Sequence, residues 1–175
     1  MKRALWPIVY VAGVVLANVL TERLGLVSVG FGLVTTAGTY AAAVVLIARN
    51  LSQDEIGRRA VLVLMLAGVV LSWWLASPQL AVASGVAFAL SEAADMSVYT
   101  PLRKRGRSRS LAAASIVGAV VDTFVFLYLA GFPLSAAPGQ LIVKAGMGLA
   151  AALLLRGAAA LTQRPIRTTQ AVPEA

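Results

Sequence analysis

Several ionisable and amide side chains occur inside long apolar stretches of this chain, and their types suit the binding of a small polar solute. Carboxylates accept hydrogen bonds from N–H groups, whereas lysine and amide side chains donate them. If these stretches cross a membrane, each ionised group costs roughly 2.5–3.5 kcal/mol on insertion scales, so it should face a partner, a bundle interior or a wet cavity. The candidate binding residues are Asn18, Glu92, Asp95, Asp122 and Lys144, with Gln140 as a weaker sixth.

Helical spacing places the first pair of carboxylates on one stripe of an apolar segment. Successive members of this stripe are four, four, three and four residues apart, which brings them to one face of a helix. Glu92 and Asp95 are one turn apart, so they repel each other unless a cation lies near. The stripe consists of Ser84, Phe88, Glu92, Asp95 and Tyr99.

The next two apolar segments carry polar faces of their own. Asp122 shares a face with Ser115 and Gly118, and Lys144 shares one with Gln140. One interpretation is that such groups only hold the helices together, through an Asp–Lys pair and hydrogen bonds. Because four ionisable groups fall in three consecutive segments of so small a protein, we favour a polar central cavity that binds a solute.

The composition indicates that nearly the whole chain is membrane domain. The chain has 175 residues, of which 59% are hydrophobic and 13% charged, and its mean hydropathy is +0.85. Several stretches approach the roughly 20 apolar residues that span a bilayer. We predict an all-α, polytopic membrane protein with a six-helix domain over residues 1–161 and a disordered cytoplasmic tail over 162–175. The predicted spans are Leu5–Leu20, Phe31–Ala48, Ala60–Ala76, Gln79–Leu102, Leu111–Phe132 and Pro138–Leu161.

The basic residues predict the orientation. Thirteen of the 15 lysines and arginines fall on one side if both termini are cytoplasmic, and the exceptions are Arg23 and Lys144. We therefore expect a multi-pass protein of the plasma or inner membrane. The alternative, a signal peptide cleaved near Ala17, would leave five helices and place the charged loops on the wrong side.

Several function classes are excluded or disfavoured. The chain has no cysteine and no histidine, which rules out disulfides, thiolate or imidazole metal sites and Cys- or His-based catalysis. The basic residues that give the net charge of +8 lie in short loops and at the chain ends. We therefore interpret them as indicators of membrane topology rather than of nucleic-acid binding. We expect no cofactor and no enzyme activity, since Ser91, Glu92 and Asp95 are the only candidates for acid–base work.

The segment from Ala83 to Ala130 resembles the queuosine-precursor transporter family, also called the vitamin uptake transporter (VUT) family. The similarity extends over all six segments, and Asn18 and Lys144 match the polar residues of the family's first and sixth helices. The chain departs from the family pattern at Arg49-Asn50-Leu51, where an acidic residue is usual. The motifs that carry the resemblance are Asp95, Val98-Tyr99, the basic run 103–109, Ser115, Gly118 and Asp122-Thr123-Phe124-Val125-Phe126.

The resemblance implies import of 7-cyano-7-deazaguanine and 7-aminomethyl-7-deazaguanine. A guanine-like base offers a ring N–H beside an exocyclic amine, and one carboxylate, Glu92 or Asp122, can accept both. Lys144, Asn18 or Gln140 could donate to the ring carbonyl, and Phe88 or Tyr99 could stack on the flat face. A cationic aminomethyl group would need a second carboxylate, for which Asp95 is the candidate.

Two other classes of function stay open on the sequence. One is a substrate-binding subunit of an importer driven by a separate ATPase module, because the chain has no nucleotide-binding motif of its own. The other is a purely structural membrane protein in which Asp122 and Lys144 only pair with each other. A homodimer and an ATPase module are the protein partners to be considered.

Overall fold

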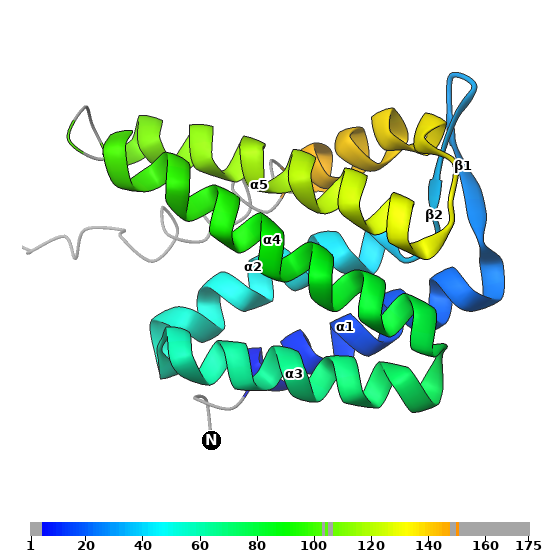
Figure 1. Ribbon diagram of the computed structural model, residues 1–175, viewed down its shortest axis with the longest axis horizontal. Coiled ribbons are helices and arrows are strands. Elements are labelled where there is room, and N and C mark those ends of the chain that lie inside the picture. The colour runs from blue at the N-terminus through cyan, green and yellow to red at the C-terminus, as the bar shows by residue number, and fades with distance from the viewer. Residues whose placement is uncertain (1–4, 103, 105–106, 148–149, 151–175) are drawn as a thin grey trace, which may run out of the picture.

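The protein is a bundle of long helices with one β-hairpin at one end (Figure 1). The computed structural model describes residues 5–102, 104, 107–147 and 150. The predicted end of the sixth span and the tail 162–175 lie outside these residues. The elements are α1 (Leu5–Leu24), β1 (Leu26–Gly30), β2 (Leu33–Thr36), α2 (Thr39–Ile56), α3 (Arg58–Leu75), α4 (Pro78–Leu102), α5 (Arg107–Ala130), the short helix η3 (Leu134–Ala136) and a helix over 137–147.

Two groups of helices make up the bundle. The most extensive contact is between α4 and α5; in Figure 1, α5 runs along the top and α4 runs diagonally from the upper left to the lower right. Below them, α1 packs against α2 and α3, and α3 packs against α4. The hairpin lies at the end where α1 finishes and α2 begins, and the α2–α3 and α4–α5 junctions lie at the opposite end. We call these the hairpin end and the junction end.

Four helices in the described part of the chain are long and apolar enough to cross a membrane. They are Leu5–Leu24, Arg58–Leu75, Pro78–Leu102 and Ala113–Ala130. The second helix has 18 residues but includes Arg49, Asp54 and Glu55 in its last two turns, which lowers its mean hydropathy. The structure thus confirms a mostly helical membrane protein, with four of the predicted spans at membrane length.

The start of the second predicted span is wrong. Residues 31–38 are not helical, because Phe31 lies at the tip of the hairpin between two glycines, and all three residues have positive φ (97° at Gly30, 53° at Phe31 and 74° at Gly32). Glycine adopts this conformation readily, and it favours a tight turn. The strands pair antiparallel, with Val27 opposite Thr35. Valine and threonine favour strands, so the helix starts only at Thr39.

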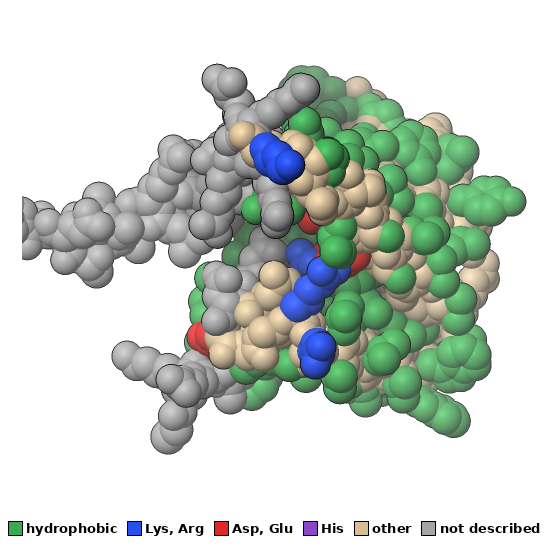
Figure 2. Space-filling model, turned by 60° about the vertical axis from the view of Figure 1, so that its left-hand side comes forward, with side chains coloured by type: hydrophobic (Ala, Val, Ile, Leu, Met, Phe, Trp, Pro, Cys, Tyr) green, Lys and Arg blue, Asp and Glu red, His purple; other side chains and the backbone are tan. Residues whose placement is uncertain are grey.

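The distribution of polar and apolar side chains is the inverse of that in a water-soluble protein. Large apolar side chains are exposed, for example Ile8 at 64% and Trp74 at 80%, whereas Asn18 is 2% and Lys144 is 7% exposed. Figure 2 shows this apolar surface in green over most of the molecule, with charged side chains gathered at the junction end. A bundle in lipid needs this arrangement, because apolar side chains contact the acyl chains and polar ones must find partners inside.

The first two helices cross closely at Gly38, the residue before α2. The Gly38 N–H donates a hydrogen bond to Thr21 Oγ1 at 3.1 Å, and a Cβ at this position would collide with the Ala17 carbonyl oxygen. We therefore expect Gly38→Ala to destabilise the protein by about 2 kcal/mol, the usual cost of overpacking. Thermal unfolding in detergent measures the effect. Gly146→Ala is the matched control, since among the described residues nothing lies within 4 Å of its Cβ position.

Candidate functional site

A cavity of about 100 Å³ lies inside the bundle, between the two groups of helices. This volume is several times the roughly 10–15 Å³ that one water molecule needs, so a small solute has room to enter. Five of the seven candidate binding residues line it: Asn18, Phe88, Asp122, Gln140 and Lys144. Glu92 and Asp95 are not part of its wall.

Lys144 is the best-connected polar residue of the cavity. Its Nζ donates to Asp122 Oδ2 at 2.7 Å, to Thr123 Oγ1 at 2.9 Å and to Gln140 Oε1 at 3.5 Å. The Lys144 side chain is 5% exposed, whereas that of Asp122 is 27% exposed. An ammonium has three protons, so this lysine is fully satisfied, and its partner carboxylate still has an accessible edge toward the cavity.

A network of uncharged groups closes the cavity at the hairpin end. Gln140 Nε2 donates to Thr36 Oγ1 at 3.0 Å, and the hydroxyl of Thr39 lies 2.9 Å from those of both Thr35 and Thr36. All four of these side chains are at most 3% exposed. The first turn of α2, the hairpin and the helix over 137–147 are thereby joined by satisfied hydrogen bonds, which makes this closure rigid.

A single hydrogen bond joins α1 to α4 across the cavity. Asn18 Nδ2 donates to Ser84 Oγ at 3.0 Å, and the Ser84 hydroxyl in turn donates to the Ala81 carbonyl at 3.2 Å. Phe88 follows Ser84 by one turn and also lines the cavity. Beyond Phe88, toward the junction end, the wall of the cavity ends and a cluster of charged side chains follows.

This charged cluster connects α2 and α3 to α4. Arg49 of α2 forms an ion pair with Glu92, and Arg58 Nη2 lies 4.0 Å from the same Glu92 oxygen. The Arg49 guanidinium carbon also lies 5.5 Å from the centre of the Phe88 ring, within the range of a cation–π interaction. Glu92 therefore has a cation nearby, as expected for a carboxylate that lies in an apolar helix one turn from Asp95.

Asp95 lies closer to α5 than to α2. A Cβ built on Gly118 of α5 would lie 3.5 Å from the Asp95 Cβ and 3.4 Å from the Ser91 carbonyl oxygen, so this carboxylate sits at the α4–α5 contact. The stripe of α4 thus divides below Phe88. Glu92 turns toward α2 and Asp95 toward α5.

The arrangement suits a small, flat, polar solute. Phe88 and Phe126 supply apolar surface, Asp122 supplies an acceptor, and Asn18 and Lys144 supply donors. Within the described ranges, no three His, Cys, Asp or Glu side chains group as metal ligands.

The comparison with protein families decides what kind of protein carries this cavity. Residues 4–159 match the family described as "Putative vitamin uptake transporter". The chain belongs to this family. It is accordingly a multi-pass membrane transporter protein, and the resemblance noted in the sequence is confirmed. The comparisons with curated proteins and with solved structures found no match.

Sequence reasoning missed part of this transporter's site. Arg49 was interpreted as an indicator of topology and as a departure from the family pattern, and Thr36 was included in a membrane helix. Tyr10 was not considered, although it is fully buried and lines the cavity. A signal existed for Tyr10, which is eight residues before Asn18 and so lies on a similar side of the helix.

Proposed function

We propose that this member of the vitamin uptake transporter family imports 7-deazaguanine bases, namely 7-cyano-7-deazaguanine and 7-aminomethyl-7-deazaguanine, across the inner membrane. The observation that carries the proposal is the accessible carboxylate of Asp122, held by Lys144 in the wall of a cavity that also contains Phe88. A guanine-like base needs these three elements: an acceptor for two adjacent N–H groups, a donor for a ring carbonyl, and a flat apolar surface.

Asp122 is the better of the two carboxylates for the base. It lines the cavity, whereas Glu92 lies beyond Phe88 and is already paired with Arg49. Lys144 remains beside Asp122 when a base binds, and it can give up its longest contact, to Gln140 Oε1 at 3.5 Å, to turn that N–H toward the ring carbonyl. Asn18 and Gln140 supply additional donors from the opposite and adjacent walls.

The aminomethyl group of the second base carries a positive charge and is expected to lie toward the junction end of the cavity. Glu92 is closest to that end of the wall, one turn beyond Phe88. Asp95 contributes to the same negative potential from the α4–α5 contact, at longer range. The cyano base lacks this charge and is expected to bind with the contacts to Asp122, Lys144 and Phe88 alone.

Transport through the bilayer needs a defined topology, and we propose six spans with both termini cytoplasmic. The helix over 137–147 begins the sixth span, and α2 forms the second in spite of its polar last turns. Arg49, Arg58 and Lys104 belong to the junction end, which would then face the cytoplasm. The hairpin and its threonine network would face the outside.

Binding to the purified protein is the direct test. In a thermal-shift titration, both deazaguanines are expected to raise the melting temperature, and guanine is expected to do so less. The absence of a shift with either deazaguanine would contradict the proposed substrate. Uptake by proteoliposomes that contain this protein alone tests the mode of transport, since binding without uptake would point to a separate ATPase module.

A further inference from the structure

The two ends of the cavity are closed in physically different ways. At the hairpin end, the closure consists of uncharged hydroxyl and amide groups that are buried and hydrogen-bonded to one another. At the junction end, an ion pair between Arg49 of α2 and Glu92 of α4 lies just beyond Phe88, which lines the cavity. These two side chains are 15% and 14% exposed, so the pair is not fully buried.

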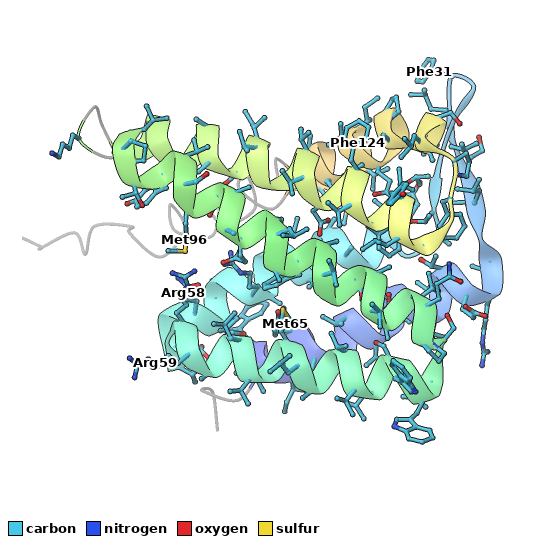
Figure 3. All side chains as sticks on the ribbon, in the orientation of Figure 1. Phe31, Arg58, Arg59, Met65, Met96 and Phe124 are labelled. Atoms are coloured by element: carbon cyan, nitrogen blue, oxygen red, sulfur yellow. The ribbon has the colours of Figure 1, made fainter. Side chains whose placement is uncertain are left out.

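The ion pair connects α2 to α4, two helices that otherwise have few contacts with each other. The helices α2 and α3 carry the cations, and α4 carries the carboxylate. Arg58 donates a hydrogen bond to the sulfur of Met96, one turn beyond Glu92 on α4, and Figure 3 shows these two side chains facing each other across the gap. Figure 2 shows charged side chains around a recess on this face.

A second cation beside Glu92 lowers the cost of opening the pair. Removing the partner of a buried charge typically costs about 3–5 kcal/mol, because the remaining charge has no compensation. Arg58 lies 4.0 Å from the same carboxylate oxygen and its side chain is 45% exposed, so it is free to follow Glu92. If Arg49 moves away, Arg58 can pair with Glu92, so the carboxylate keeps a cationic partner.

The pair is also in contact with the cavity. The Arg49 guanidinium lies over the ring of Phe88, which forms part of the cavity wall. The Tyr10 hydroxyl is buried nearby, without a hydrogen-bond partner among the described residues, and it lies in the field of both Arg49 and Glu92. A solute that presses on Phe88 would therefore move the guanidinium, and the tyrosine offers that guanidinium or Glu92 a new partner.

We propose that Arg49 and Glu92 form the inner gate of the transporter, and that their separation opens the cavity toward the junction end. Phe88 links the gate to the bound solute, and Arg58 holds Glu92 while the gate is open. The inference rests on the proposed transport function but not on the identity of the substrate. Opening requires α2 and α3 to move away from α4 while the network at the hairpin end stays intact.

Cysteine accessibility tests the gate directly, because the chain has no native cysteine. Ala42→Cys places one thiol in the wall of the cavity. A membrane-impermeant maleimide is added to inside-out and to right-side-out vesicles without substrate, and the labelling rate is measured. We expect slow labelling in the Ala42→Cys parent, and labelling at least about tenfold faster, from one side only, after Arg49→Gln or Glu92→Gln.

Two further variants separate a gate from general loosening of the bundle. The double exchange of Arg49→Glu with Glu92→Arg is expected to bring labelling back toward the parent rate. Arg59→Gln removes an exposed cation from the same turn of α3 as Arg58, and it is expected to leave labelling unchanged, since Arg59 points away from α4 in Figure 3. Parent-like labelling in both single variants, or faster labelling from the opposite side, would overturn the proposal. Neither readout depends on which base is transported.

Discussion

Asp122→Asn is expected to reduce uptake of the deazaguanines by about a hundredfold and also to lower the stability of the protein. The amide can accept at only one atom, so a base loses one charge-assisted hydrogen bond, meets an N–H donor in its place, and keeps only a weaker neutral bond, a total loss of about 3 kcal/mol. The same change leaves Lys144, whose side chain is 5% exposed, without its carboxylate at 2.7 Å. Breaking such a pair typically costs about 3–5 kcal/mol. Uptake into vesicles and melting in detergent measure the two effects separately.

The double variant Asp122→Asn with Lys144→Met distinguishes substrate binding from structural pairing. Removing both charges eliminates the uncompensated ammonium, so the melting temperature is expected to return to within a few degrees of the parent. Uptake should stay as low as in the single variant, since the acceptor and the donor are both gone. Recovery of full uptake in the double variant would instead mean that the pair only holds α5 to the helix over 137–147.

The positions of the helices were predictable because a helix that crosses a bilayer needs a long run of apolar residues, which the sequence shows directly. The predicted spans Ala60–Ala76 and Gln79–Leu102 differ from α3 and α4 by at most two residues at either end. The hairpin was not predicted, because the apolar residues Phe31, Leu33 and Val34 extend the apolar stretch of the following helix toward the N-terminus. The glycines beside Phe31 were the available signal, since two glycines around one residue favour a turn with positive φ.

The polar residues of the cavity were predictable for a different reason. An Asn, Asp or Lys in the middle of an apolar span is costly, so its presence alone indicates a partner, and Asn18, Asp122 and Lys144 all have one. Arg49 gave no such signal, because a cation near a helix end also satisfies the positive-inside rule. Which carboxylate meets which cation depends on how α2 crosses α4, and helical spacing alone contains no information about that crossing.

The different contacts of Asp122 and Glu92 suit these two carboxylates to different roles. Asp122 has one buried cationic partner and an accessible edge toward the cavity, which suits a group that binds a solute. Glu92 has two cations on a neighbouring pair of helices and partial access to water, which suits a group that changes partners. Asp122, the carboxylate proposed to bind the solute, lies deep in the bundle, and Glu92, the carboxylate proposed to change partners, lies nearer the junction end. Recognition and release of the solute would then depend on different residues.

Phe88→Leu is expected to raise the apparent KM for deazaguanine uptake by about tenfold. The substitution keeps a partly buried apolar side chain but removes the flat ring on which a base can stack. Stacking of one base on an aromatic side chain is worth about 1–3 kcal/mol. Phe88→Tyr retains the ring and should keep a KM close to that of the parent. Initial rates of uptake over a range of substrate concentrations measure the effect.

The matched control for this change is Phe124→Leu in α5. Phe124 is 43% exposed on the apolar surface, so the same loss of a ring there is expected to leave KM unchanged. Phe88 also lies beneath the Arg49 guanidinium, and a weakened gate would speed labelling of Ala42→Cys, whereas a lost stacking surface would not. If Phe88→Leu raised KM no more than Phe124→Leu did, the ring would not be a stacking surface, and the flat shape of the proposed substrate would lose its principal support.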